Sequence, residues 1–144
     1  MSSKFDKYII TKPKPTPKNH EIMDTPDVMT PLLWMDDSII KGAFYMECNW
    51  FHKPTQYSPK THTHEFDEVL AYIGIDPENP KDLNGEVEFW IEDEKLTLTE
   101  SCIVYVPKGL KHCPMHIRRA DRPIFHFSCG MAGNYVRGNQ KDED

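Results

Sequence analysis

Between residues 43 and 128, short segments typical of β-strands alternate with turn signals, and this succession most constrains the fold. Turns follow one another about every eight to twelve residues, as in β-sandwiches and barrels, and no stretch shows the apolar period of an amphipathic helix. The segments expected to form strands are 43–52, 86–92, 95–99, 103–106, 113–118 and 123–128. The sequence therefore predicts an all-β fold in a single domain, either a sandwich or a barrel.

Length, charge and cysteine usage narrow the functional class. The 144 residues are the size of one domain, and the net charge of -6 argues against nucleic-acid binding because no basic stripe could neutralise phosphates. No apolar run reaches membrane-spanning length, and the polar N-terminus does not resemble a signal peptide. The four cysteines lie far apart and are expected to be reduced thiols. We therefore expect a soluble cytoplasmic protein that binds neither nucleic acid nor a membrane.

Proline content divides the chain into three parts. Residues 1–31 form a proline-rich N-terminal arm, in which proline favours an extended path over a long helix. Residues 32–130 contain the predicted β domain, and residues 131–144 form a polar, charged tail. The apolar residues 8–10 give the arm something to bury, and small barrels commonly pair through an outer sheet. We expect a homodimer to which the arm and the aromatic strand 43–52 contribute.

The stretch from Thr61 to Gly74, THTHEFDEVLAYIG, carries metal-ligating residue types in one register. His62, His64 and Glu68 share a parity, so on an extended strand their side chains leave the same face. Two imidazoles and a carboxylate suit one divalent transition metal: Fe, Mn, Ni, Co, Zn or Cu. The alternative is a set of ordinary surface side chains near a turn.

A second stretch, VPKGLKHCPMH, places His112 after a turn that contains Pro107 and Gly109. Together the two stretches read H-x-H-x3-E-x5-G and P-x-G-x2-H, and over residues 43–130 this pair resembles the cupin family. The resemblance implies a single-domain β-barrel of the jelly-roll type, in which the two motifs face each other and bind one metal. The ligands that it implies are His62, His64, Glu68 and His112. The insertion 75–84 departs from the family pattern, which usually joins these strands tightly.

Three further residues are candidates for moving a proton to or from a substrate, namely Tyr72, His116 and His126. Tyr72 shares the parity of the first-motif ligands, and its alternative is a packed barrel tyrosine. His116 shares the parity of His112, although Pro114 between them could introduce a bulge. His126 points into the barrel if its phenylalanine neighbours point outward. For both histidines the alternative is a satisfied core or interface side chain.

Three residues have weaker support. His52 could face the site from the strand 43–52. Arg118 could hold a substrate carboxylate in a bidentate fork, although a solvated arginine at the end of a strand is the commoner case. Cys113 follows His112 directly and could approach the site, with structural packing as the alternative.

Two hypotheses for the function follow. The first is a metal-dependent enzyme that acts on a small oxygen-rich molecule, as a dioxygenase, lyase, decarboxylase or isomerase; the fold does not choose among these. The second is a non-catalytic module that binds or senses a small molecule through its metal. A purely structural metal is a third, weaker interpretation.

Overall fold

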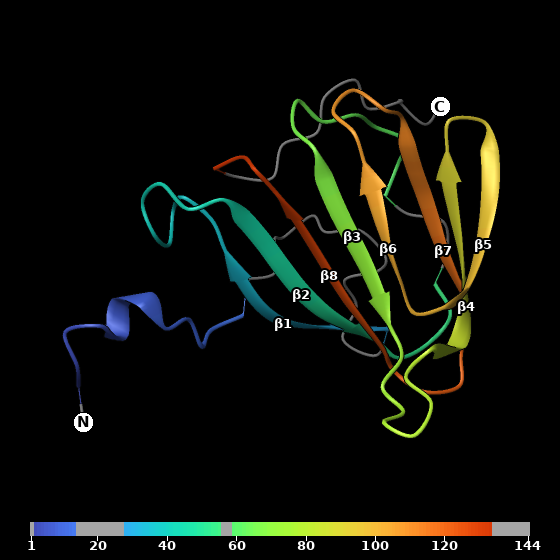
Figure 1. Ribbon diagram of the computed structural model, residues 1–144, viewed down its shortest axis with the longest axis horizontal. Coiled ribbons are helices and arrows are strands. Elements are labelled where there is room, and N and C mark those ends of the chain that lie inside the picture. The colour runs from blue at the N-terminus through green and yellow to red at the C-terminus, as the bar shows by residue number, and fades with distance from the viewer. Residues whose placement is uncertain (1, 14–27, 56–58, 134–144) are drawn as a thin grey trace.

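The computed structural model describes residues 2–13, 28–55 and 59–133, and its regular structure is almost entirely β. Eight strands form two antiparallel sheets (Figure 1). The elements are the 3-10 helix η1 (Asp6–Tyr8) and the strands β1 (Met29–Met35), β2 (Tyr45–Phe51), β3 (Glu68–Ile73), β4 (Asp82–Ile91), β5 (Glu94–Glu100), β6 (Cys102–Val106), β7 (His112–Ala120) and β8 (Ile124–Gly130). The predicted all-β fold is confirmed.

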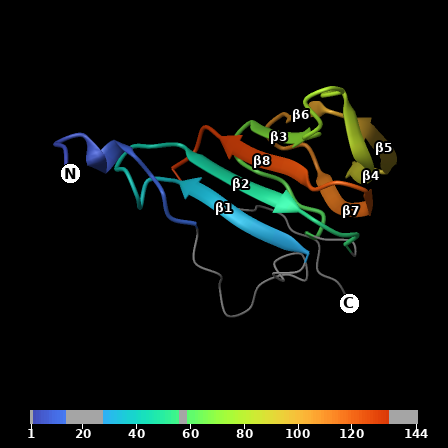
Figure 2. The same cartoon turned by 90° about the horizontal axis from the view of Figure 1, so that it is seen from below.

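The two sheets divide the strands unequally. The five-stranded sheet has the order β1-β2-β8-β3-β6, and the three-stranded sheet has the order β5-β4-β7. Figure 2, seen from below, shows the first sheet running diagonally and the second at its far end. Neighbours that are distant in sequence, such as β2 and β8, pair over their full lengths. This arrangement brings the first and the last strands of the fold to one sheet.

Apolar side chains from both sheets meet in one core. Phe51 and Tyr72 come from the five-stranded sheet, and Phe89 and Ile117 come from the three-stranded sheet. Each of these four side chains is at most 2% exposed. On β2 the two fully buried residues are Tyr45 and Phe51, so the face that they share is the inner one. The sequence alone left this face undecided, because both faces of the strand are mixed.

Three boundaries differ from the sequence prediction. The strand β1 begins at Met29 and pairs with β2, although the prediction assigned residues up to 31 to the arm. In the first motif only Glu68–Ile73 is a strand, so residues 61–67 approach it by an irregular path. The strand β4 begins at Asp82, inside the predicted insertion 75–84, with a register shift before Val87.

The two ends of the chain are described only in part. The segment 2–13 contains η1 and lies away from both sheets (Figure 1). The remainder of the proline-rich stretch, residues 14–27, and the tail from residue 134 lie outside the described residues. Within the described ranges, no helix has the length and apolar character needed to cross a membrane.

Candidate metal centre

The two motifs are joined through their backbones before their side chains meet. His62 and His112 form an isolated antiparallel bridge, with both N–H···O distances at 3.1 Å. The Gly109 amide donates to the His64 carbonyl at 3.0 Å, and Gly109 has φ +83°, a left-handed conformation that favours glycine. The Lys108 amide donates to the Asp67 carboxylate at 2.9 Å. The proline-glycine turn is therefore held against the irregular segment that carries the first two histidines.

Four donor side chains converge inside the molecule. Nε2 of His64 lies 3.3 Å from Oε2 of Glu68, and Nε2 of His112 lies 3.1 Å from Oε1 of the same carboxylate. Nε2 of His62 lies 3.2 Å from Nε2 of His64. All four side chains are at most 2% exposed. The structure thus brings together the four residues that the sequence predicts as metal ligands.

The opposite ring nitrogens fix the tautomers of two of the imidazoles. Nδ1–H of His62 donates to the Lys60 carbonyl at 2.6 Å, and Nδ1–H of His112 donates to the Leu110 carbonyl at 3.0 Å. When these rings are neutral, each Nε2 carries a lone pair rather than a proton. Such hydrogen bonds from Nδ1 are the usual way in which proteins orient metal-binding histidines. The Nε2 lone pair of His112 therefore points at the Glu68 carboxylate, and that of His62 points at Nε2 of His64.

A cation between these atoms would turn a repulsive arrangement into an attractive one. A lone pair that faces a carboxylate at hydrogen-bond distance is repulsive unless an extra proton or a metal lies between them. Ligands at about 2.1 Å from a metal lie about 3.0–3.4 Å apart at octahedral or tetrahedral angles. The separations of 3.1–3.3 Å fall in this range. By its donor set, His64, Glu68 and His112 with His62 adjacent, the centre fits a divalent transition metal.

Tyr45 completes the centre, and sequence reasoning missed it. Its buried hydroxyl donates to Oε2 of Glu68. Burial alone would raise the pKa of Glu68, but the contacts with His112 and His64 and the hydrogen bond from the Tyr45 hydroxyl lower it to about 2. Gly130 makes room for this contact, because a Cβ there would lie 2.4 Å from Phe66 and 2.8 Å from Tyr45. Glu68 is therefore an ionised and firmly oriented carboxylate.

Comparison with solved structures identifies the architecture. An oxalate oxidase in complex with the substrate analogue glycolate superposes with a TM-score of 0.54 at 11% identity, over 83% of this chain and 58% of its own. A Klebsiella pneumoniae subsp. pneumoniae protein with a double-stranded β-helix domain superposes with a TM-score of 0.53 at 11% identity, over 88% of this chain and 100% of its own. The chain has the cupin fold.

The relationship is one of structure rather than of sequence. Neither a protein-family model nor a curated protein matches the chain. The chain spans 58–59% of the length of the oxalate oxidases. The likeness therefore concerns the arrangement of the two antiparallel sheets.

Tyr72 and His126 both lie inside this cupin fold. They are paired across β3 and β8, and their rings lie 4.7 Å apart. The Tyr72 hydroxyl donates to Sδ of Met115 at 2.5 Å, and burial raises the pKa of Tyr72 well above its usual value. Nδ1–H of His126 donates to the Ala71 carbonyl at 2.8 Å, and burial lowers the pKa of His126 to about 4. Near neutral pH both groups are therefore uncharged.

His116 faces the other side of its strand. The inward residues of β7 after the turn are Met115 and Ile117, whereas His116 lies opposite Glu88, with Nδ1 at 3.9 Å from the carboxylate. The cause is a register shift between β4 and β7 next to His112, which reverses the parity of the following residues as far as Ile117, after which a second shift follows. The structure does not bring His116 to the donor cluster.

The three weaker candidates lie in different parts of the fold. Arg118 is half-exposed beside His116 and pairs with Glu88 at 3.2 Å. His52 lies at the edge of β2, where Nε2 is 2.6 Å from the Thr30 hydroxyl. Cys113 is 3% exposed, and its Sγ belongs to a group of potential metal donors with His62 and His112. Of these three, only Cys113 lies beside the centre.

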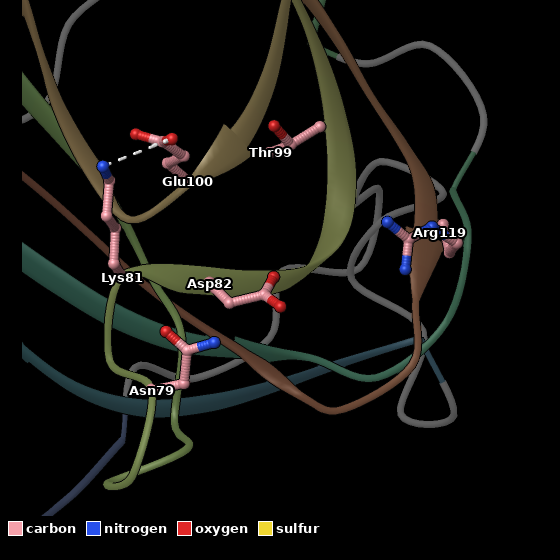
Figure 3. A pocket seen from close by; sticks show the side chains of 6 residues that line it. All are labelled: Asn79, Lys81, Asp82, Thr99, Glu100 and Arg119. Atoms are coloured by element: carbon pink, nitrogen blue, oxygen red, sulfur yellow. Dashed lines mark ion pairs between the residues drawn. The ribbon is translucent and has the colours of Figure 1, made fainter.

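A polar depression of about 310 Å³ lies elsewhere (Figure 3). Its lining residues are Asn79, Lys81, Asp82, Thr99, Glu100 and Arg119. It lies at the beginning of β4 and the end of β7, whereas His112 begins β7, so the two sites are about 23 Å apart along the strand. The cations of this depression already pair with acids, Lys81 with Glu100 at 3.7 Å and Arg119 with Asp121. It is therefore not part of the donor cluster.

Proposed function

We propose that this chain is a metal-dependent enzyme of the cupin type that acts on a small, oxygen-rich molecule. One divalent transition metal would bind to His62, His64, Glu68 and His112. The observation that carries the proposal is the convergence of three buried Nε2 atoms and one ionised carboxylate, with the Nδ1 protons of two of the rings held by backbone carbonyls. A metal in this position supplies Lewis-acid activation of a substrate oxygen.

The chain supplies the orientation and the protons. Tyr45 fixes the carboxylate of Glu68 through its hydroxyl. The Tyr72 hydroxyl donates to a thioether, which is a weak acceptor, so a substrate oxygen would compete for this proton. The His126 ring lies against the Tyr72 ring at a tilt of 30° and would hold it in place. His116 has no part in the proposal, since it lies on the opposite face of β7.

The comparisons support the substrate class by analogy only. The solved structures with this fold include oxalate oxidases, one of which is in complex with glycolate. Oxalate and glycolate are both small molecules rich in oxygen. At 11% identity these neighbours do not choose among dioxygenase, lyase, decarboxylase and isomerase chemistry for this chain.

Turnover by metal-loaded protein tests the proposal. Protein purified without chelators and then stripped would be reloaded separately with Fe, Mn, Ni, Co, Zn or Cu. Each form would be incubated with small hydroxy acids, keto acids, dicarboxylates and sugar acids, and products would be followed by NMR and by oxygen consumption. We expect turnover with at least one metal, and its loss in His64→Ala. Stoichiometric metal without turnover of any compound would reject the enzyme.

A binding module is the second candidate, and one observation favours it. The two interior groups able to move a proton already have internal partners, Tyr72 with Met115 and His126 with the Ala71 carbonyl. A module that binds or senses a small molecule needs only the metal. Saturable ligand binding by the metal-loaded protein, measured by calorimetry and without product formation, would establish this alternative.

We also propose that the chain forms a homodimer through the outer face of the five-stranded sheet. This face is apolar: Trp50 and Phe125 pair across β2 and β8, and Leu33, Ile103 and Tyr105 are 41%, 67% and 57% exposed. Five strands of about seven residues cover on the order of 550 Å². A standard interface buries about 800 Å² on each partner, so the exposed apolar side chains of the N-terminal segment would supply the rest.

Light scattering tests the dimer and its face. We expect the mass of two chains at micromolar concentration, and of one chain when Ile103 and Tyr105 are both replaced by lysine. The matched control places lysine at Thr97 and Thr99, exposed on the three-stranded sheet, and should remain dimeric. A monomeric wild type would reject the dimer, and a dimeric Ile103→Lys/Tyr105→Lys variant would reject the face. The cytoplasmic location stays a prediction from the sequence.

A further inference from the structure

The donor cluster has a second side, which is formed by sulfur. Sγ of Cys113 and one ring nitrogen each of His62 and His112 all lie within 4.8 Å of one another. The buried donors therefore form two triads that share His112. One triad adds His64 and Glu68, with a carboxylate oxygen, and the other adds His62 and Cys113, with a thiol.

Cys113 reaches this position because the strand is irregular there. Adjacent residues on a regular strand face opposite sides, yet His112 and Cys113 are both buried, at 0% and 3% exposed. Phe89 and Ile91 on β4 pair with Met115 and His112, so two steps on β4 face three steps on β7. One extra residue is thus accommodated, and Cys113 takes φ +68°.

Core packing alone explains this position poorly. The left-handed region costs an ordinary residue about 1–2 kcal/mol, and glycine, asparagine and aspartate are the residues that tolerate it. A small apolar side chain could fill the same core space from a regular strand position at no such cost. The irregularity instead leaves the thiol near a ring nitrogen of each of two histidines that belong to the proposed metal centre.

We propose that Cys113 donates a thiolate to the metal and makes the centre selective for thiophilic divalent ions, zinc and cobalt, over manganese. The inference rests on the metal centre of the proposed function. On binding, the thiol passes its proton to solvent, a sulfur–metal bond forms, and the metal stays divalent. Sulfur at about 2.3 Å and nitrogen at about 2.1 Å from one ion lie about 3.1–3.6 Å apart at octahedral to tetrahedral angles, inside the 4.8 Å envelope of the triad. Thiolate ligands favour zinc, whereas manganese prefers oxygen donors.

Cobalt spectroscopy tests this assignment without reference to activity. Reduced, metal-free protein would receive one equivalent of Co²⁺, and the near-ultraviolet sulfur-to-cobalt charge-transfer band would be recorded. We expect the band in the wild type and in Cys102→Ser, and its loss in Cys113→Ser. Cys102 is the matched control, a half-buried thiol at the start of β6. Competition titrations should show zinc affinity reduced at least tenfold in Cys113→Ser, with manganese affinity changed less than twofold.

Each outcome decides a different statement. Stoichiometric cobalt without a band in the wild type overturns the thiolate and leaves the metal centre of the proposed function intact. Absence of cobalt binding overturns both. A band that persists in Cys113→Ser assigns the sulfur elsewhere and also overturns the inference. Should Cys113→Ser not fold, a variant with serine at the three other cysteines, Cys48, Cys102 and Cys129, must keep the band, which could then come only from Cys113.

Discussion

Two clusters in this molecule place histidine beside glutamate, and they differ in how the negative charge is balanced. In the interior, Glu68 lies 3.1 Å from His112 and 3.3 Å from His64, and no lysine or arginine of the described residues pairs with it. On the outer face of the three-stranded sheet, Glu88 lies 3.9 Å from His116. Glu88 also pairs with Arg118 at 3.2 Å and with Lys95 at 3.7 Å. The outer carboxylate is thus already neutralised by fixed cations.

The difference shows what distinguishes a metal site from a salt-bridge network. Histidine near glutamate is not sufficient, since both clusters have it. What matters is whether the imidazole nitrogens present lone pairs and whether a permanent cation already occupies the space. The inner cluster meets the first condition through the carbonyls of Lys60 and Leu110. It therefore has a place for a metal, and the outer cluster has none.

We expect the largest difference in metal content between two alanine variants of β7, one at His112 in the inner cluster and one at His116 in the outer cluster. His112→Ala removes a ligand and should lower the metal content from about one per chain to less than a tenth, because a buried ligand is lost. His116→Ala, four residues along β7, should leave the content unchanged. Metal analysis of chelator-free protein measures both. Equal loss, or no loss, in the two variants would end the distinction between the clusters.

A third environment, a buried imidazole hydrogen-bonded to a backbone carbonyl, sharpens the comparison through its pH dependence. His126 has a pKa of about 4 in the folded protein because burial disfavours its charged form, against about 6.5 in the unfolded chain. Between these values the unfolded chain binds more protons, so stability should fall as the pH falls from 6.5 to 4 and His126 should add nothing below that. The loss is on the order of 3 kcal/mol.

Urea unfolding of the metal-free protein at several pH values measures this effect. His126→Asn removes the titrating group and keeps a side chain able to donate to the Ala71 carbonyl. The difference between wild type and variant should shrink steadily from pH 6.5 to pH 4. Glu68, with a pKa lowered to about 2, acts in a separate window, where stability is lost as the pH falls below about 4.5. If the free energies of unfolding of wild type and His126→Asn changed in parallel with pH, the lowered pKa of His126 would be contradicted.

The hydroxyl of Tyr45 tests how firmly the inner carboxylate is held. Tyr45→Phe removes the donor to Oε2 of Glu68 and keeps the ring that packs against Phe66. Groups that orient a metal ligand typically change metal affinity by about 10–100-fold, and we expect a loss in this range. Competition with a chromophoric chelator would measure it. Affinity equal to that of the wild type would show that the histidines alone position the carboxylate.

The sequence predicts the members of the inner cluster better than it predicts the path that brings them together. The shared parity of Glu68 and Tyr72 holds because both lie on β3, a regular strand. His62 and His64 arrive on an irregular segment, where strand alternation does not apply, and the bridge to His112 positions them instead. The motif spacing predicts the ligands because it marks two segments that pair with each other. The expectation of one extended strand from His62 to Glu68 is wrong, since the strand begins only at Glu68.

Residues that depend on a local irregularity or on a distant strand were harder to predict. The parity between His112 and His116 breaks at Cys113, which has a φ of +68°. No residue pattern predicts this backbone conformation, although Pro114 indicates that a bulge could occur. Tyr45 was missed because its partner, Glu68, is 23 positions away in the sequence and on a different strand. Strand pairing, rather than local periodicity, decides which face of β2 is buried.

The smallest effect is expected at the outer cluster itself. Glu88→Gln removes the negative charge and keeps an oxygen that can accept from Arg118. Glu88 is only 7% exposed, but its partners Arg118 and Lys95 are both 49% exposed and can return to water. The free energy of unfolding should therefore fall by about 1 kcal/mol or less, and by less still at high salt.

Urea unfolding at low and high salt measures this change, and metal analysis of the same protein supplies the second half of the comparison. The metal content should equal that of the wild type, because Glu88 and Glu68 lie on different sheets. If the free energy of unfolding fell by several kcal/mol, the ion pairs of Glu88 would contribute more to stability than surface ion pairs usually do. A loss of metal would mean that the pairing of β4 with β7 transmits the change to His112, and the two clusters would then have to be treated as one coupled unit.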